Sequence, residues 1–328
     1  MIYMTFFTII LLIYSTYLVV SFSIQLSYGT GKIKLPPLQN GTNSTKVVIL
    51  AFDDSPKSQY ILAKPALDKY GYKGSFFTVC TFVNNGVNRQ GIKSMNWQDI
   101  NALHQQGHDI ESHTMTHTGL NNKSEKKLNY EIGDSKQCLL NHGINSTIFA
   151  YPSSTGSENN TIINIVSKYY DLARSGDAPL TFLHCDGYKK ENDCTPLNKK
   201  DKVKYENRYD VKNWSDRPKE QTDNHVIISM NKTQMYSQFI NEVNSQSKYN
   251  KNGCINTIPI VVYHNFIVDN NHIERSNESA TDIGLFSKEL KYLHDKGFIV
   301  LKMSDLGYNP ISKFNYIKKH TNLNMKNC

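Results

Sequence analysis

Val47-Val-Ile-Leu-Ala-Phe52, followed directly by Asp53-Asp54, is the stretch that decides the fold of this chain. A continuous apolar and β-branched run predicts a strand with both faces buried, as in a parallel sheet. Two adjacent carboxylates then stand at its C-terminal end, and in α/β folds that end carries the chemistry. The stretch Asp53-Asp54-Ser55-Pro56 also fits a simple turn, because Asp, Ser and Pro are turn formers.

A second group of polar side chains follows another short strand. His113-Thr-Met-Thr-His117 comes directly after the strand predicted at 109–112. If the chain turns helical there, the two imidazoles lie on one face, one turn apart, at metal-ligand spacing. One such spacing by chance is unremarkable among 11 histidines. Together with one carboxylate, however, the pair supplies the three protein ligands of a metal site with an open position, which suits hydrolysis.

The chain beyond these motifs alternates strands with helical stretches. Repeated strand-then-helix units argue for a parallel barrel with its site at the C-terminal face of the strands. We expect strands at 47–52, 74–79, 109–112, 147–150, 171–174, 226–230, 258–263 and 298–301, and helices at 60–70, 97–106, 124–142, 161–170, 234–245 and 286–296.

The order of the motifs resembles a known family. Phe-Asp-Asp, His-Thr-x-x-His, an aromatic-Pro pair and a strand ending in His occur in the polysaccharide deacetylases of the chitooligosaccharide deacetylase type, carbohydrate esterase family four. The resemblance runs from about Lys46 to about Leu306. It implies an irregular (β/α) barrel of about seven parallel strands, and removal of N-acetyl groups from a glycan.

The resemblance also implies a role for each motif residue. Asp54, His113 and His117 would bind a divalent metal, with zinc as the expected ion, and Asp53 would be the base that deprotonates the attacking water. His264, at the end of Ile258–Tyr263, would protonate the leaving amine, although a histidine at a strand end is more often structural. Substrate-binding residues are expected at Tyr151, Pro152, Ser153 and Arg174.

The third family motif is altered in this chain. Many members have Arg-x-Pro-Tyr where this chain reads Ala150-Tyr-Pro-Ser153, so Ala150 stands in place of the arginine that orients the base. The backbone N–H of Ser153 could still donate to an oxyanion. Arg174, at the next strand end, either replaces the missing arginine or is a solvated surface charge. The fourth motif, Asp-x-x-Asp-Trp, is matched only loosely by Asp210–Trp214.

Two other function classes stay open. A catalytically weakened, metal-retaining glycan-binding protein would bind sugar without releasing acetate, but it has no need of a free base such as Asp53. A hydrolase of another C–N bond, in an imide or formamide-like group, would cleave small amides and not oligosaccharides. Nothing in the sequence excludes the second class.

The N-terminus is apolar and sets the expected location. Residues 1–31 contain no charged side chain, which fits a membrane anchor or a signal peptide, and we favour the anchor. Lys32 and Lys34 follow the span, and the positive-inside rule would place them in the cytoplasm. Against this, a glycan-modifying enzyme meets its polymer outside the cell, so we expect a catalytic domain at the cell surface, or secreted after cleavage.

The expected domains are an anchor or signal peptide at 1–26, a linker at 27–45, a catalytic domain at 46–306 with a loop insertion at 177–225, and a tail without a clear element at 307–328.

The remaining composition limits the partners. The net charge of +8 comes from dispersed lysines without an aromatic-interleaved stripe, so no nucleic-acid partner is expected. Cys185 and Cys194, two of six cysteines, bracket a polar loop and are the expected disulfide in an exported protein. The oligomeric state has no signal. Eight Asn-x-Ser/Thr sequons suggest a glycoprotein and start at Asn40, Asn43, Asn122, Asn145, Asn159, Asn213, Asn231 and Asn277.

Overall fold

A computed structural model describes residues 46–176, 178–183, 207–221, 227–268, 280–311 and 314–318. These residues all belong to one unit of the chain, residues 39–328. The expected anchor or signal peptide, the linker, Cys185 and Cys194 lie outside the described residues and stay predictions, as does most of the insertion. Within the described ranges, none of the helices has both the length and the apolar character needed to cross a membrane.

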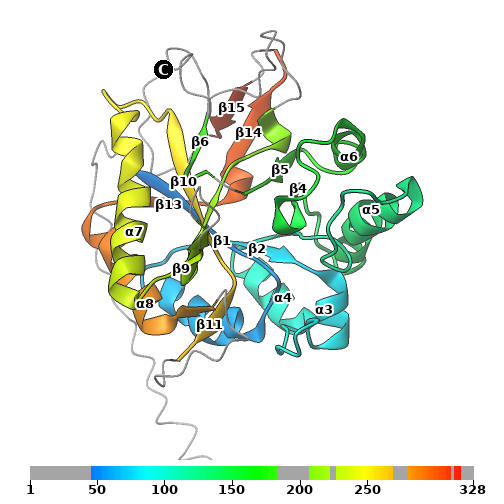
Figure 1. The fold of residues 1–328 in the computed structure, drawn as a ribbon, viewed down its shortest axis with the longest axis horizontal. Helices are drawn as coiled ribbons and strands as arrows, with labels where there is room; N and C mark the ends of the chain where they lie inside the picture. The colour runs from blue at the N-terminus through cyan, green and yellow to red at the C-terminus, as the bar shows by residue number, and fades with distance from the viewer. Residues whose placement is uncertain are drawn as a thin grey trace, which may run out of the picture. The chain divides into compact units, whose positions relative to one another are not determined.

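The central element is a mostly parallel sheet around β1 (Figure 1). Among the described residues it has nine strands in the order β5-β4-β3-β2-β1-β10-β6, with β13 also paired to β1 and β7 to β10. Every pairing is parallel except that of β6 with β10. The strands are β1 (Val47–Phe52), β2 (Ser75–Thr78), β3 (Asp109–Ser112), β4 (Ile148–Ala150), β5 (Leu172–Arg174), β6 (Leu180–Phe182), β7 (Trp214–Ser215), β10 (Thr257–Tyr263) and β13 (Ile299–Leu301).

This arrangement confirms the expected irregular, incomplete barrel. The end strands β5 and β6 do not pair with each other in the described part of the chain, so the sheet curls without closing. One expected barrel strand is placed wrongly: β9 (Ile227–Ser229) pairs antiparallel with β8 (Lys219–Gln221) in a separate two-stranded sheet. Strand propensity at 226–230 indicated a strand correctly, but it carries no information about the partner, which here comes from the insertion.

Helices cover the outer face of the sheet (Figure 1). Polar caps start several of them: Asn96, Ser124, Asn231 and Asp282 each accept a hydrogen bond from a backbone N–H of the first turn. The helix expected at 60–70 divides into a π-helical turn, η1 (Gln59–Ala63), and α2 (Lys64–Asp68). The others are α3 (Cys80–Asn85), which was not expected, α4 (Trp97–Gln105), α5 (Glu125–Asn141), α6 (Asn160–Val166), α7 (Lys232–Ser245) and α8 (Ile283–Asp295).

Alternate residues of β1 belong to two different core clusters. Val48, Leu50 and Phe52 pack in the outer cluster, which also contains side chains of the surrounding helices. Val47, Ile49 and Ala51 pack in the inner cluster, which is built mainly from other strands. Full burial of each large side chain contributes about 1.5–3 kcal/mol, so both faces stabilise the strand. Because side chains alternate, the odd-numbered residues of β1 face the inside of the curled sheet.

The C-terminal residues form a hairpin that was not expected. β14 (Leu306–Asn309) pairs antiparallel with β15 (Phe314–Ile317), although residues 307–328 were predicted to have no clear element. Leu306 and Ile317 are buried in the inner cluster. The hairpin shows little of the apolar–polar alternation that is typical of strands. Its packing against the barrel, and not local strand propensity, therefore stabilises it. A further pair of short parallel strands, β11 (Asn265–Ile267) and β12 (Ala280–Asp282), follows β10.

Candidate metal centre

The two adjacent aspartates come together because the chain leaves β1 in an unusual conformation. Asp53 continues the odd-numbered residues of β1, so strand alternation directs it to the inner face. Asp54 and Ser55 then have positive φ values of 71° and 59°, which breaks the alternation. The bend is held by hydrogen bonds from Val79 N to Ser55 Oγ (3.2 Å) and from Met95 N to Ser55 O (2.8 Å). Both carboxylates lie near His113, whose Nε2 is 3.7 Å from Asp53 Oδ2 and 3.6 Å from Asp54 Oδ1.

The two histidines approach Asp54 from the end of β3. His113 Nε2 lies 3.6 Å and His117 Nε2 lies 3.1 Å from Asp54 Oδ1. Nδ1 of His113 lies 2.9 Å from the carbonyl oxygen of Ala150, so a proton on Nδ1 donates to that carbonyl and leaves Nε2 as a lone pair. A carbonyl partner of this kind fixes both the tautomer and the orientation of a metal-binding imidazole.

The helical turn that would put both histidines on one face does not form. In the structure residues 113–120 form a loop, with positive φ values at Thr114 (73°) and His117 (55°). The loop is shaped by Glu131 on α5, whose carboxylate accepts hydrogen bonds from Thr116 N (2.9 Å) and Thr116 Oγ1 (2.7 Å). The rings of the two histidines still meet, with centroids 4.8 Å apart. Tertiary contacts thus bring about the convergence that helical spacing was expected to give.

The protonation states of the three side chains suit a cation. Burial lowers the pKa of His113 to about 3, and burial also lowers the pKa of His117, so both imidazoles are neutral near pH 7. Burial raises the pKa of the Asp54 carboxyl to about 6. Asp54 Oδ1 is buried and receives no hydrogen bond from any described residue, which is costly for a carboxylate oxygen. A divalent cation would supply the missing partner, because the ligand atoms of Asp54, His113 and His117 lie within 4.8 Å of one another.

Asp53 is held separately, by an arginine from a distant strand. Arg174 Nη2 donates to Asp53 Oδ1 over 2.5 Å, while Arg174 Nη1 donates to Asn213 Oδ1 over 2.7 Å. Its guanidinium also lies over the ring of Phe77, 4.4 Å from the centroid. Burial opposes ionisation of Asp53, but the charge of Arg174, with further contributions from His113 and His264, outweighs it and leaves the pKa of Asp53 below its usual value.

Arg174 is therefore not a surface charge, since only 4% of it is exposed. It is the register partner of Ala150 on the neighbouring strand β5, and its guanidinium contacts Asp53. Its second partner, Asn213, belongs to Asp210–Trp214, the segment that loosely matches the fourth family motif. Asn213 is 3% exposed, so its sequon is buried in the folded protein.

His264 lies on the other side of the aspartates. Asp53 N donates to Tyr263 O over 2.9 Å, which places the end of β10 beside the end of β1. His264 contributes to the pKa of both Asp53 and Asp54, so its side chain lies near both carboxylates. Its Nδ1 is buried and has no hydrogen-bond partner within the part of the chain that the structure describes. Gln59, on η1, fastens the two strand ends by donating to Asp53 O (2.6 Å) and His264 O (2.9 Å).

Gln59 has no signal in the sequence, because a glutamine six positions after a motif is unremarkable. Of the residues expected near substrate, Ser153 is exposed and Pro152 is buried. Ser153 has a φ of 51°, in the kinked turn that follows β4. Tyr151 is only 3% exposed and packs edge-on against Phe149, so the structure does not present its side chain to solvent.

A disulfide that the sequence did not suggest supports the histidine loop. Cys80, the first residue of α3, is bonded to Cys138 on α5. Cys80 N also donates to Thr114 O (3.4 Å), and α5 carries Glu131, so the bond joins two elements that both contact the loop. The expected pair, Cys185 and Cys194, lies outside the described residues.

Fold and site together define a class: an α/β barrel-like protein with a candidate carboxylate–imidazole metal site at the C-terminal edge of a parallel sheet. The family model for polysaccharide deacetylase matches residues 40–172 of this chain. The matched range includes Asp53, Asp54, His113 and His117, but not Arg174 or His264.

Individual relatives are matched over part of their length. A 115-residue segment (35% of this chain) is 30% identical to YxkH, a candidate polysaccharide deacetylase of Bacillus subtilis (strain 168), and covers 39% of that protein. A 136-residue segment (40% of this chain) is 31% identical to a gellan lyase of a Bacillus species and covers 5% of it. The Streptococcus pyogenes deacetylase PplD, solved in complex with acetate, is 27% identical, with a TM-score of 0.39 over 44% of this chain and 62% of that chain. The chain thus spans less than two thirds of each of these proteins.

Proposed function

We propose that this protein is a divalent-metal-dependent hydrolase that removes N-acetyl groups from a glycan. The observation that carries the proposal is the pairing of two differently held aspartates. Asp54 contacts two neutral imidazoles through an otherwise unpaired oxygen, while Asp53 is kept ionised by Arg174. One carboxylate is suited to hold a cation, and the other is suited to take a proton.

The residues Asp54, His113 and His117 would hold the cation, with zinc as the ion that this donor set favours. A cation there would act as a Lewis acid on the acetyl carbonyl and lower the pKa of water. The remaining steps belong to the chain's own side chains. Asp53 accepts a proton from the attacking water as the new C–O bond forms, and Arg174 keeps its carboxylate aimed at that water.

His264 would complete the reaction on the leaving group. Its protonated imidazole donates to the amine nitrogen as the C–N bond breaks, so acetate and a free amino sugar leave. Its place at the end of β10, near both aspartates, supports this role. The backbone N–H of Ser153, in the turn after β4, is a candidate donor to the oxyanion.

Two observations support the catalytic reading over a glycan-binding protein that has lost its chemistry. The base is retained, and the arginine missing from the third motif has a replacement in contact with that base. We also propose that the domain acts outside the cytoplasm, at the cell surface or secreted. The Cys80–Cys138 disulfide supports this location, because disulfides persist in oxidising compartments.

The deciding experiment measures acetate release from N-acetylglucosamine oligomers by the zinc-loaded chain. Asp53→Asn should abolish release while zinc binding persists in calorimetry, and His113→Ala should abolish both. His104→Ala, at an exposed position on α4, is the matched control and should change neither. Equal, negligible release by wild type and all variants would reject the deacetylase proposal. Hydrolysis of formamides or cyclic imides by the same wild-type sample would then assign the site to other C–N bonds.

A further inference from the structure

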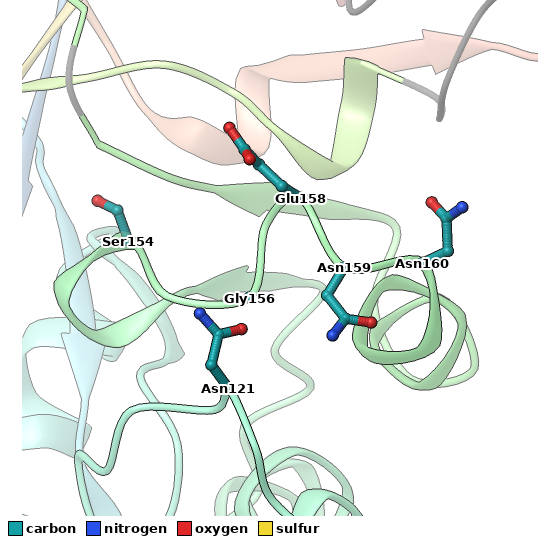
Figure 2. A pocket seen from close by; sticks show the side chains of 6 residues that line it. All are labelled: Asn121, Ser154, Gly156, Glu158, Asn159 and Asn160. Atoms are coloured by element: carbon teal, nitrogen blue, oxygen red, sulfur yellow. The ribbon is translucent and has the colours of Figure 1, made fainter. Parts of the chain in front are cut away.

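A polar hollow lies on the chain segments that continue from the candidate metal centre. Its volume is about 450 Å³, within the range of small-molecule sites. Its lining residues are Asn121, Ser154, Gly156, Glu158, Asn159 and Asn160. Figure 2 shows Asn121 pointing from one loop toward the segment around Gly156, which belongs to the other wall. None of these six residues was singled out as a substrate contact from the sequence.

Both walls of the hollow are extensions of the site. Asn121 is four positions beyond His117, so its Cα lies within about 14 Å of the Cα of that histidine by chain length alone. Ser154 follows Ser153 directly, and its N–H donates to Tyr151 O over 3.2 Å. The walls are joined to each other, because Leu120 N donates to Thr155 Oγ1 over 3.0 Å. Both walls thus continue chain segments of the site, and a polymer bound with one residue at the metal centre would extend along them.

The lining chemistry fits a sugar better than an apolar or anionic ligand. Within the described residues, the side chains of Asn121, Glu158 and Asn160 make no hydrogen bond to other protein groups, so they remain available. Amide groups offer both donors and acceptors, as sugar hydroxyls do. Asn159 is different, because its Oδ1 already accepts from Thr161 N and caps α6.

Glu158 adds a preference in charge. It is exposed, belongs to the lining of the hollow and forms no ion pair with any other described residue, so it adds a negative charge to that lining. A carboxylate attracts a protonated amino group and repels an acidic sugar. Deacetylation produces sugars with a protonated amino group, which the carboxylate attracts. The hollow is therefore suited to a chain that has already lost an acetyl group nearby.

We infer that the hollow is a subsite for a neighbouring sugar residue of the glycan, and that Glu158 favours a residue with a free amino group. The inference rests on the proposed deacetylase function, because it places the substrate chain across the metal centre. It adds a specificity: partly deacetylated oligomers should be better substrates than fully acetylated ones of the same length.

The test compares kcat/KM for acetate release from N-acetylglucosamine tetramers with and without one free amino group. In wild type the partly deacetylated tetramer should be preferred. Glu158→Gln should reduce that preference about tenfold, the size of one charge-assisted hydrogen bond. Asn121→Ala should raise KM for both tetramers more than it changes kcat. Asn241→Ala, in a separate polar hollow on α7, is the matched control and should leave both values unchanged.

Calorimetric binding of the same tetramers to the whole metal-free chain separates the two hypotheses. If acetate is released but Glu158→Gln and Asn121→Ala behave like wild type in kinetics and binding, the subsite is wrong and the deacetylase proposal stands. If no acetate is released by any variant, yet both substitutions weaken tetramer binding relative to Asn241→Ala, the deacetylase proposal fails and the sugar site stands.

Discussion

Arg174, the last residue of β5, donates a hydrogen bond of 2.5 Å to Asp53, which follows β1 and lies 121 positions earlier. Three strands, β4, β3 and β2, separate β5 from β1 in the sheet. In a flat sheet the two strands would lie about 19 Å apart, since neighbouring strands are spaced by about 4.8 Å. The contact therefore exists only because the sheet curls and turns both residues toward its inside.

Replacing Arg174 should impair turnover without releasing the metal. Arg174→Ala leaves the Asp53 carboxylate buried and removes the guanidinium that orients it. We therefore expect kcat to fall about 100-fold. Arg174→Lys should recover part of this loss, because it keeps the charge but not the forked geometry. Zinc affinity, measured by calorimetry, should stay close to wild type in both. A normal kcat in folded Arg174→Ala would show that Arg174 does not orient the base. Unfolding curves must accompany the assay, because removing one partner of a buried ion pair costs about 3–5 kcal/mol.

Replacing Glu131 should weaken metal binding from a distance. Its carboxylate holds the backbone and hydroxyl of Thr116, next to His117. Loss of such an outer partner typically reduces metal affinity by about 10–100-fold, and we expect Glu131→Ala to do so in zinc titrations. Glu125→Ala, at an exposed position on the same helix, is the control. Equal zinc affinity in the two variants would mean that the loop keeps its shape without Glu131.

The Cys80–Cys138 disulfide should stabilise the fold. It closes a loop of 58 positions, for which the chain-entropy model gives about 4 kcal/mol. We expect Cys80→Ala/Cys138→Ala to lower the free energy of unfolding in urea by up to this amount, because its unfolded chain gains entropy. Adding reductant should destabilise wild type in the same direction. A change below about 0.5 kcal/mol in the double variant would be that of an ordinary surface substitution and would contradict the assignment.

Asp216 should contribute a loss of stability as pH rises. This residue follows β7, is fully buried, and accepts a hydrogen bond from Thr281 Oγ1 (3.1 Å). Burial raises the pKa of its carboxyl from 3.8 to about 7. Between these values the folded state keeps a proton that the unfolded state has lost, so stability declines as pH rises through that window and levels off above it.

Asp216→Asn tests this expectation. The amide cannot ionise, so the decline between about pH 4 and pH 7, on the order of a few kcal/mol, should become shallower. The measurement is urea unfolding of both proteins at several pH values. Glu289 is a second buried carboxyl whose pKa burial raises and whose proton is coupled to that of Asp216, so a smaller slope should remain. Parallel stability profiles for the two proteins would exclude Asp216 as the source.

Much of the fold was predictable because its signals are local. The apolar runs at β1 and at the strand before His264 each show their burial in consecutive residues. The C-terminal hairpin and β9 were harder, since short strands take their place from their partners. The helical turn between His113 and His117 failed for a related reason: Glu131, distant in sequence, sets the loop.

The sequence by itself determined which side chains follow the strands, because a buried strand is recognised from its consecutive residues. It therefore placed Asp53, Asp54, His113, His117 and His264 at one edge of the sheet. Only the tertiary structure decided their partners. Arg174 reaches Asp53, Gln59 joins two strand ends, and Cys80 meets Cys138 through strand order and curl. These depend on contacts between residues far apart in the chain, which no pattern of neighbouring residues encodes.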